Sequence, residues 1–147
     1  MSYVITTEID INAGPEAVWG ALVDFPRYGQ WSTFSRVEGT AQVGNRLSMK
    51  MPGFSFRSAV TLARPGEQLQ WSGTLISERL FLGRHTFILL AKPDATTHLT
   101  NHEEFSGGLT TLMQRFMKQS NDNGYTAFNA GLKRHVEEGA TQQSLTK

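Results

Sequence analysis

Residues 81–106 read FLGRHTFILLAKPDATTHLTNHEEFS and predict a β-hairpin. Two alternating segments flank a turn at residues 93–95, which contains Pro, Asp and Ala. We place Lys92 opposite Thr96, because this brings apolar residues of both segments onto one face. The register then predicts three opposed pairs: Leu89 with Leu99, Phe87 with Asn101, and His85 with Glu103.

Segments with the same alternation lie before this hairpin. Residues 3–11 place Ile, Tyr and Thr on one face, and residues 43–51 place Leu and Met on one face. Residues 54–62 and 69–75 flank a turn at Pro65-Gly66. Pairing across that turn predicts two opposed pairs, Leu62 with Leu69 and Val60 with Trp71. The apolar faces of the two segments then agree, which favours an antiparallel meander.

Helical patterns occur near both ends of the chain. Pro15 suits the first turn of a short helix over residues 16–23, and a second short helix is expected to end at Trp31. After Gly107-Gly108, apolar residues at three- and four-residue steps predict a long helix to Glu138, with Gly139 as its stop. A helix of that length spans about 45 Å, enough to cross the sheet.

This order of elements predicts an α+β helix-grip plan. We expect a curved antiparallel sheet of six or seven strands around the long C-terminal helix, with two short helices after the first strand. A twisted sheet curls, and a straight helix cannot fill its concave side everywhere, so we expect a pocket between them. The predicted lining is mainly Met and aromatic residues: Met49, Met51, Phe56, Trp71, Phe81, Phe87, Asn101, Phe105, Met113, Phe116, Met117 and Phe128. Each side chain alone could equally be plain core packing.

The run PEAVWGALVDFPRYGQW at residues 15–31 resembles the opening of the START/polyketide-cyclase (SRPBCC) superfamily. The segments LGRHTF at residues 82–87 and HEEFSGGL at residues 102–109 resemble it too. The resemblance covers nearly the whole chain and implies the helix-grip fold of the birch pollen allergen. It implies binding of lipids, plant hormones, sterols or polyketides, and in some members cyclisation or dehydration. It also implies a structural role for three residues that fasten the small helices to the sheet: Trp19, Phe25 and Trp31.

His85 and Glu103 are the candidate catalytic residues. The predicted register makes them direct cross-strand neighbours whose side chains point into the pocket, with Asn101 on the same face. A buried carboxylate needs a partner, and a histidine beside it could orient or protonate a ligand carbonyl. The alternative is that these residues only satisfy each other's hydrogen bonds.

Several classes of function are disfavoured. The net charge is +1 without a basic cluster, so nucleic acid is not an expected partner. The chain has no Cys, no His spacing typical of a metal site and no phosphate-binding loop, so no metal or cofactor is expected. The N-terminus lacks signal-peptide character and no stretch could span a membrane, so we expect a cytoplasmic protein without stable membrane insertion.

We predict one domain over residues 1–140 and a polar tail over residues 141–147. The preferred function is binding or carriage of a small hydrophobic or amphipathic molecule, such as a lipid or polyketide. A second reading is a polyketide cyclase or dehydratase that uses His85 and Glu103 as an acid–base pair. A third is a regulatory or interaction domain with a collapsed pocket, acting through a protein partner or as a homodimer.

Overall fold

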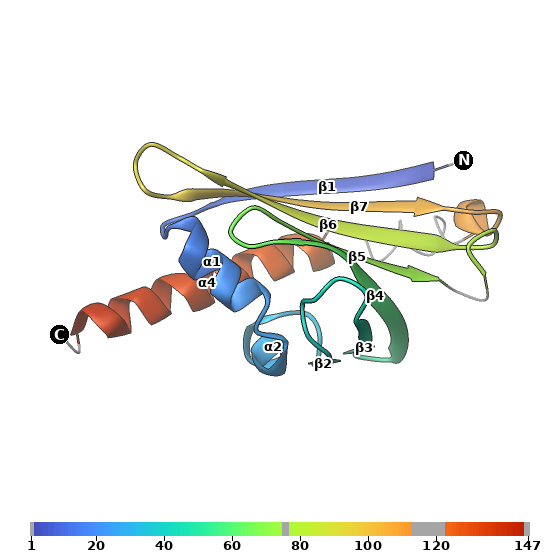
Figure 1. Ribbon diagram of the computed structural model, residues 1–147, viewed down its shortest axis with the longest axis horizontal. Coiled ribbons are helices and arrows are strands. Elements are labelled where there is room, and N and C mark those ends of the chain that lie inside the picture. Colours follow the sequence, from blue (N-terminus) through green and yellow to red (C-terminus); the bar gives the residue numbers. More distant parts are fainter. Residues whose placement is uncertain (1, 75–76, 113–122, 146–147) are drawn as a thin grey trace.

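The computed structural model describes residues 2–74, 77–112 and 123–145 of the chain. It has a seven-stranded antiparallel sheet with its helices on one side, which confirms the predicted α+β helix-grip fold (Figure 1). The elements are β1 (Ser2–Ile11), α1 (Pro15–Leu22), η1 (Phe25–Arg27), α2 (Tyr28–Trp31), β2 (Arg36–Glu38), β3 (Arg46–Met51), β4 (Phe54–Arg64), β5 (Gln68–Thr74), β6 (Leu82–Ala91), β7 (Thr97–Ser106) and α4 (Asn123–Leu145).

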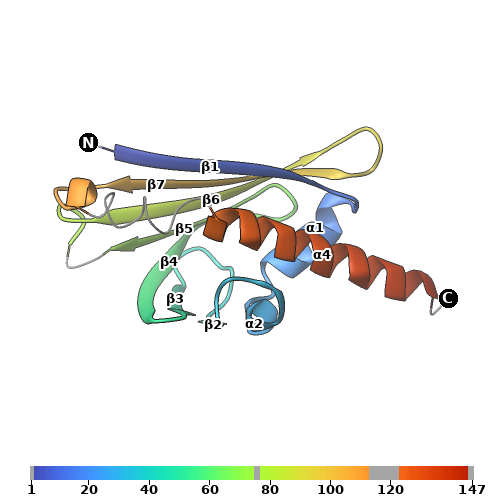
Figure 2. The same ribbon diagram turned by 180° about the vertical axis from the view of Figure 1, so that it is seen from behind.

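The strands are ordered β1-β7-β6-β5-β4-β3-β2, so the first strand forms one edge of the sheet, beside the last strand. The sheet bends strongly along β4, and α1, α2 and α4 lie on its concave side in both views (Figures 1 and 2). Alternate residues of each strand therefore face either the helices or solvent. No helix among the described residues has the length and apolar character that a membrane crossing requires.

The predicted registers are confirmed for one hairpin and partly wrong for the other. In β6–β7 all three predicted pairs occur, including His85 opposite Glu103. In β4–β5, Val60 lies opposite Trp71 as predicted, but Leu62 pairs with Gln70 rather than with Leu69. A β-bulge between Val60 and Leu62 inserts one residue and shifts the register beyond it. Alternation of apolar residues alone does not reveal such an insertion.

The C-terminal helix ends later than predicted. Helix α4 continues through Gly139 to Leu145, so the expected stop at Gly139 is wrong. A glycine inside a helix costs only about 1 kcal/mol relative to Ala. Residues 140–143, which follow Gly139 and read ATQQ, are compatible with a helix. The predicted stretch of this helix over residues 113–122 lies outside the described residues. A different glycine, Gly131, is required for packing, because a Cβ there would lie 2.1 Å from the carbonyl oxygen of Trp31.

The core beneath α1 and α2 is a continuous aromatic cluster, made of Phe25, Tyr28, Trp31, Phe34, Trp71, Phe87 and Phe128. Its members are at most 6% exposed. Ring centroids of Trp31 and Phe128 are 5.0 Å apart, and those of Phe87 and Phe128 are 5.3 Å apart. The hydroxyl of Tyr28 donates to the backbone oxygen of Leu22, and burial raises the pKa of this phenol well above its ordinary value. The small helices are thus fastened to the sheet and to α4 by T-shaped ring contacts.

Candidate ligand-binding site

Three neighbouring rows of residues cross the concave face between β4 and β1. The middle row is Val60, Trp71, His85, Glu103 and Ile5. The row on the side of the β4–β5 turn contains Leu69, Phe87, Asn101 and Thr7. The row on the other side is Ser58, Gly73, Gly83, Phe105 and Tyr3. The site is therefore a small polar group within an aromatic surface.

His85 and Glu103 form the centre of this polar group. Nδ1 of His85 lies 3.0 Å from Oε2 of Glu103, and their side chains are 10% and 14% exposed. Although the distance is that of an ion pair, Oε2 has no hydrogen-bond partner among the described residues. The His85 ring stacks on Phe87 with centroids 4.4 Å apart, which holds the imidazole plane in place. Glu103 keeps hydrogen-bonding capacity for another molecule.

A hydrogen-bonded chain connects His85 to α4. Nδ2 of Asn129 donates to Oγ1 of Thr7 at 2.8 Å, and Nδ2 of Asn101 donates to Oδ1 of Asn129 at 2.8 Å. Oδ1 of Asn101 is then left as the acceptor for Nε2 of His85, at 2.6 Å. The order of donors along the chain thus places a proton on Nε2 of His85.

The order of donors also bears on the contact between His85 and Glu103. With Nε2 of His85 donating to Asn101, Nδ1 is the ring nitrogen that faces Glu103, 3.0 Å from Oε2. An imidazole nitrogen and a carboxyl oxygen can each donate or accept a hydrogen bond, according to which of them carries a proton. The arrangement is chemically able to orient a polar ligand atom and to exchange one proton with it.

The predicted lining residues fall into three groups. Met49, Trp71, Phe87 and Phe128 are at most 2% exposed, Asn101 is fully buried, and all of these pack in or beside the aromatic cluster. Met51, Phe56 and Phe81 are half-buried, and together with Phe105 they make up what we call the Phe81 end of the concave face. The ring of Phe81 stacks on Phe105 with centroids 5.5 Å apart. Met113, Phe116 and Met117 lie outside the described residues.

Three residues of the site escaped the sequence prediction. Thr7 and Asn129 complete the hydrogen-bonded chain. Asn129 interrupts the apolar stripe of α4 between Tyr125 and Leu132, and a polar residue at a core position is a usable signal for a buried network. Ser58 lies opposite Gly73 of β5, but the pairing of Gly73 with Gly83 depends on the β5–β6 register, which the sequence pattern did not define.

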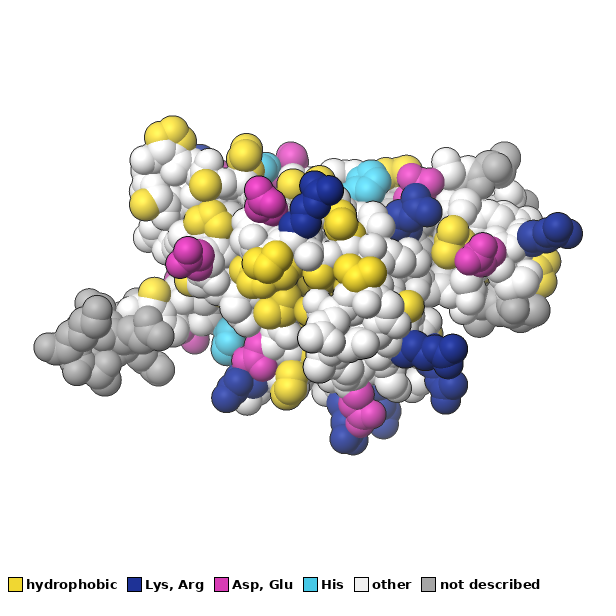
Figure 3. Space-filling model, viewed as in Figure 1, with side chains coloured by type: hydrophobic (Ala, Val, Ile, Leu, Met, Phe, Trp, Pro, Cys, Tyr) yellow, Lys and Arg dark blue, Asp and Glu magenta, His cyan; other side chains and the backbone are white. Residues whose placement is uncertain are grey.

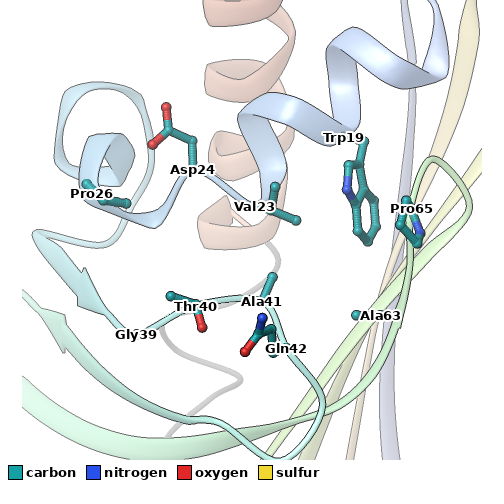
Figure 4. Close-up of a pocket in the computed structure, with 10 residues that line it drawn as sticks. All are labelled: Trp19, Val23, Asp24, Pro26, Gly39, Thr40, Ala41, Gln42, Ala63 and Pro65. Atoms are coloured by element: carbon teal, nitrogen blue, oxygen red, sulfur yellow. The ribbon is translucent and has the colours of Figure 1, made fainter.

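A pocket of about 380 Å³ lies elsewhere, between the end of α1 and the β4–β5 turn. Figure 4 shows Trp19 of α1 lying beside Pro65, with Ala41 on the opposite side of the groove. Figure 3 shows hydrophobic side chains gathered near the middle of the corresponding face. None of the predicted site residues lines this pocket, and its one ionised side chain, Asp24, is already paired with Arg27 at 2.6 Å.

The outer face carries a second histidine–carboxylate group. Nδ1 of His98 lies 2.7 Å from Oδ1 of Asp10, and its Nε2 lies 3.4 Å from Glu8. The hydrogen bond to Asp10 and then that to Glu8 raise the pKa of His98. Within the described residues, no cluster of His, Asp and Glu has a geometry suited to a metal ion. This group is solvated, so its chemistry differs from that of His85 and Glu103.

Solved structures of other proteins share this fold. A hypothetical protein from Helicobacter pylori superposes with a TM-score of 0.79 at 14% identity, covering 91% of this chain and 88% of that one. Norcoclaurine synthase from Thalictrum flavum, a point mutant in complex with a transition state analogue, gives 0.74 at 11% identity, covering 95% and 97%. The di-domain ARO/CYC from the steffimycin biosynthetic pathway gives 0.74 at 11%, covering 96% of this chain and 52% of that one. These similarities establish the fold.

A family model described as polyketide cyclase / dehydrase and lipid transport matches residues 3–137. No curated protein matches the chain. The matched range runs from β1 into α4 and includes every residue of the polar group described above. The chain therefore belongs to the polyketide cyclase/dehydrase and lipid transport family, within the START/polyketide-cyclase (SRPBCC) superfamily.

Proposed function

We propose that this protein binds a small amphipathic molecule against the concave face of the sheet, at the Phe81 end. The apolar body of the ligand packs on Phe56, Phe81 and Phe105, and its polar group meets His85 and Glu103. The observation that carries the proposal is the carboxylate oxygen Oε2 of Glu103, which is buried and accepts no hydrogen bond from the described residues. Burying such an atom is costly unless a partner is supplied.

Family membership supports a small-molecule ligand. The family description names polyketide cyclase, dehydrase and lipid transport, all of which handle molecules with extended apolar parts. The aromatic and methionine side chains of the Phe81 end suit such a molecule, because these side chains repack around different shapes. The His85–Glu103 pair would then determine the orientation in which the ligand lies.

A second function, proton transfer to the bound molecule, is favoured by the imidazole of His85 and the carboxyl group of Glu103 lying side by side, 3.0 Å apart. In this reaction the pair donates a proton to a ligand carbonyl oxygen and recovers it from the ligand in a later step, as in cyclisation or dehydration. Turnover of a carbonyl ligand by the native protein, lost in Glu103→Gln with binding retained, would establish this activity. Binding with no turnover would leave carriage alone.

Native mass spectrometry of the protein purified from its own cell tests the binding proposal. We expect a native mass above that of the 147-residue chain, and the mass of the chain alone after denaturation. The released molecule then serves as the ligand for variants. Identical native and denatured masses, together with no thermal stabilisation by amphipathic probes, would contradict the proposal.

Adjacent glutamates provide a matched pair of variants. Glu103 faces the concave side, whereas Glu104 is on the outer face of the same strand, opposite Arg84. We expect Glu103→Gln to weaken binding of the released ligand about tenfold or more, since a charge-assisted hydrogen bond is lost. Glu104→Gln should leave affinity unchanged. If His85→Ala and Glu103→Gln lower thermal stability but not affinity, the pair has only a structural role.

A further inference from the structure

We propose that Gly73 and Gly83 form the floor of a subsite for a hydroxyl group of the bound molecule, with Ser58 and Glu103 as its hydrogen-bond partners. This inference rests on the proposed function and deepens it by naming the polar group of the ligand. It concerns the row of the concave face next to Trp71 and His85.

The two glycines remove side chains from the centre of the sheet. Gly73 of β5 lies directly opposite Gly83 of β6, so both positions on the concave face lack a side chain. Glycine weakens a strand interior and commonly marks a bulge, or a close approach of a ligand or of another backbone. At Gly73 the neighbouring strand is one such backbone, because the backbone oxygen of Arg57 lies 2.9 Å from the position of a Cβ. At Gly83 the three nearest atoms are all side-chain atoms, of Phe105 and Glu103, and the β5–β6 register runs without a shift from Gln68 to Thr74.

Ser58 places an unpartnered hydroxyl beside this floor. The residue is 6% exposed, and its Oγ has no hydrogen-bond partner among the described residues. Oγ lies 2.9 Å from the position that a Cβ on Gly73 would take. The Ser58 hydroxyl and the Arg57 backbone oxygen thus both border Gly73, on the side of β4.

Glu103 approaches the floor from the opposite side. Its Oε1 lies 3.9 Å from the position of a Cβ on Gly83, while its Oε2 lies beside His85. The ring of Phe105 borders the same position at 3.4 Å and stacks on Phe81. The glycine floor is thus bordered by one hydroxyl, one carboxyl group and a wall of aromatic rings.

These neighbours select for a hydroxyl. A ligand hydroxyl can donate to Glu103 or accept from Ser58, whereas a ketone can only accept and a methyl group can do neither. The aromatic wall suits a flat apolar body that carries this hydroxyl. The subsite thus distinguishes a hydroxylated ring from its methyl analogue of similar size.

The test compares 1-naphthol with 1-methylnaphthalene by calorimetry and by amide NMR of Gly73 and Gly83. We expect 1-naphthol to bind about tenfold more tightly and to shift both glycine amides, because only it forms the hydrogen bonds. Ser58→Ala and Glu103→Gln should each reduce the ratio of the two affinities to about threefold or less. Glu104→Gln, on the outer face, should leave the ratio unchanged.

Gly83→Ala tests the floor itself. A methyl group there meets Phe105 at an ordinary contact distance of 3.4 Å, so the variant can fold, but it occupies the proposed subsite. We expect it to weaken binding of both probes about tenfold. Gly20→Ala is the matched control, since a Cβ at this exposed position of α1 meets nothing within 4 Å.

The outcomes distinguish failure of the hydroxyl subsite from failure of the proposed binding function. If both probes bind equally and shift the amide of Trp71 but not those of the glycines, the subsite is wrong and the proposed function stands. A preference for 1-naphthol that survives in Ser58→Ala and Glu103→Gln also overturns the subsite. If neither probe binds, the subsite and the proposed function both fail.

Discussion

The two ends of the concave face are built from similar residues but packed differently. Under α1 and α2, rings of the aromatic cluster contact one another at centroid distances from 4.8 to 6.3 Å, and Tyr28 and Phe87 are fully buried. At the Phe81 end, Phe56 and Phe81 remain half-buried, and Ser58 and Glu103 carry polar atoms with no hydrogen-bond partner among the described residues.

The difference separates residues that hold the fold from residues that are available to a ligand. In the aromatic cluster, the rings around Tyr28 are tilted or T-shaped, and its hydroxyl donates to a backbone oxygen. Nε1 of Trp31 is also buried there without a hydrogen-bond partner among the described residues, but no half-buried ring of the cluster lies beside it. At the Phe81 end, the network that starts at Thr7 reaches His85 and stops, because Glu103 has only an ion-pair contact. Incomplete polar satisfaction beside half-buried rings is typical of a binding site.

The largest effect should come from Phe128→Ala in the aromatic cluster. Its ring contacts Trp31 and Phe87, so the free energy of unfolding should fall by about 3–5 kcal/mol in urea titrations. Phe81→Ala, the matched variant at the other end, should cost less than about half of this, because Phe81 is only half-buried. Equal losses would mean that both ends are packed alike.

Asn101→Leu should have the next largest effect. It leaves Nε2 of His85 and Oδ1 of Asn129 without their partners, so we expect a loss of about 2–3 kcal/mol in the free energy of unfolding. Asn12→Leu, at an exposed turn position, is the control and should change stability little. An unchanged stability for Asn101→Leu would show that the network is not formed in solution.

Ser58→Ala should act in the opposite direction. Removing a buried hydroxyl that lacks a partner should raise the free energy of unfolding of the ligand-free protein by about 1 kcal/mol. Thr97→Val is the contrasting variant, because the Thr97 hydroxyl donates to the backbone oxygen of Ala13 at 2.7 Å, and it should be destabilising. A loss of stability in ligand-free Ser58→Ala would mean that Ser58 already has a partner.

The smallest effect should come from His98 on the outer face. Its pairing with Asp10 and Glu8 is exposed to solvent and can be tested separately from the buried His85–Glu103 pair. Asp10 and Glu8 raise the pKa of His98 above its ordinary value of 6.5. Because the folded-state pKa is the higher one, the stabilisation is fully present below about pH 6.5 and is lost as the pH rises through the folded value. The melting temperature of native protein should therefore exceed that of His98→Gln more at about pH 5.5 than at about pH 9. A difference that does not change with pH would contradict this pairing.

The sequence alone was sufficient to predict the fold and the opposed positions of His85 and Glu103. Period-two alternation around the turn at residues 93–95 placed His85 opposite Glu103, since a one-residue slip would have turned the apolar face outward. The bulge after Val60 was not predictable, because alternation of apolar residues does not reveal one inserted residue. The continuation of α4 past Gly139 was not predictable, because glycine commonly ends a helix but also occurs inside one at a cost of about 1 kcal/mol. The pairing of Gly73 with Gly83 could not be predicted, because the segment that connects β5 and β6 has no turn signature in the sequence.

The most direct test is a crystal structure of the full chain purified from its own cell with no ligand added. We expect continuous density for a small molecule against Gly73 and Gly83, with one polar atom within hydrogen-bond distance of Glu103. Side chains of Phe56, Phe81 and Phe105 packed directly onto His85 and Glu103, with no void between them, would contradict it.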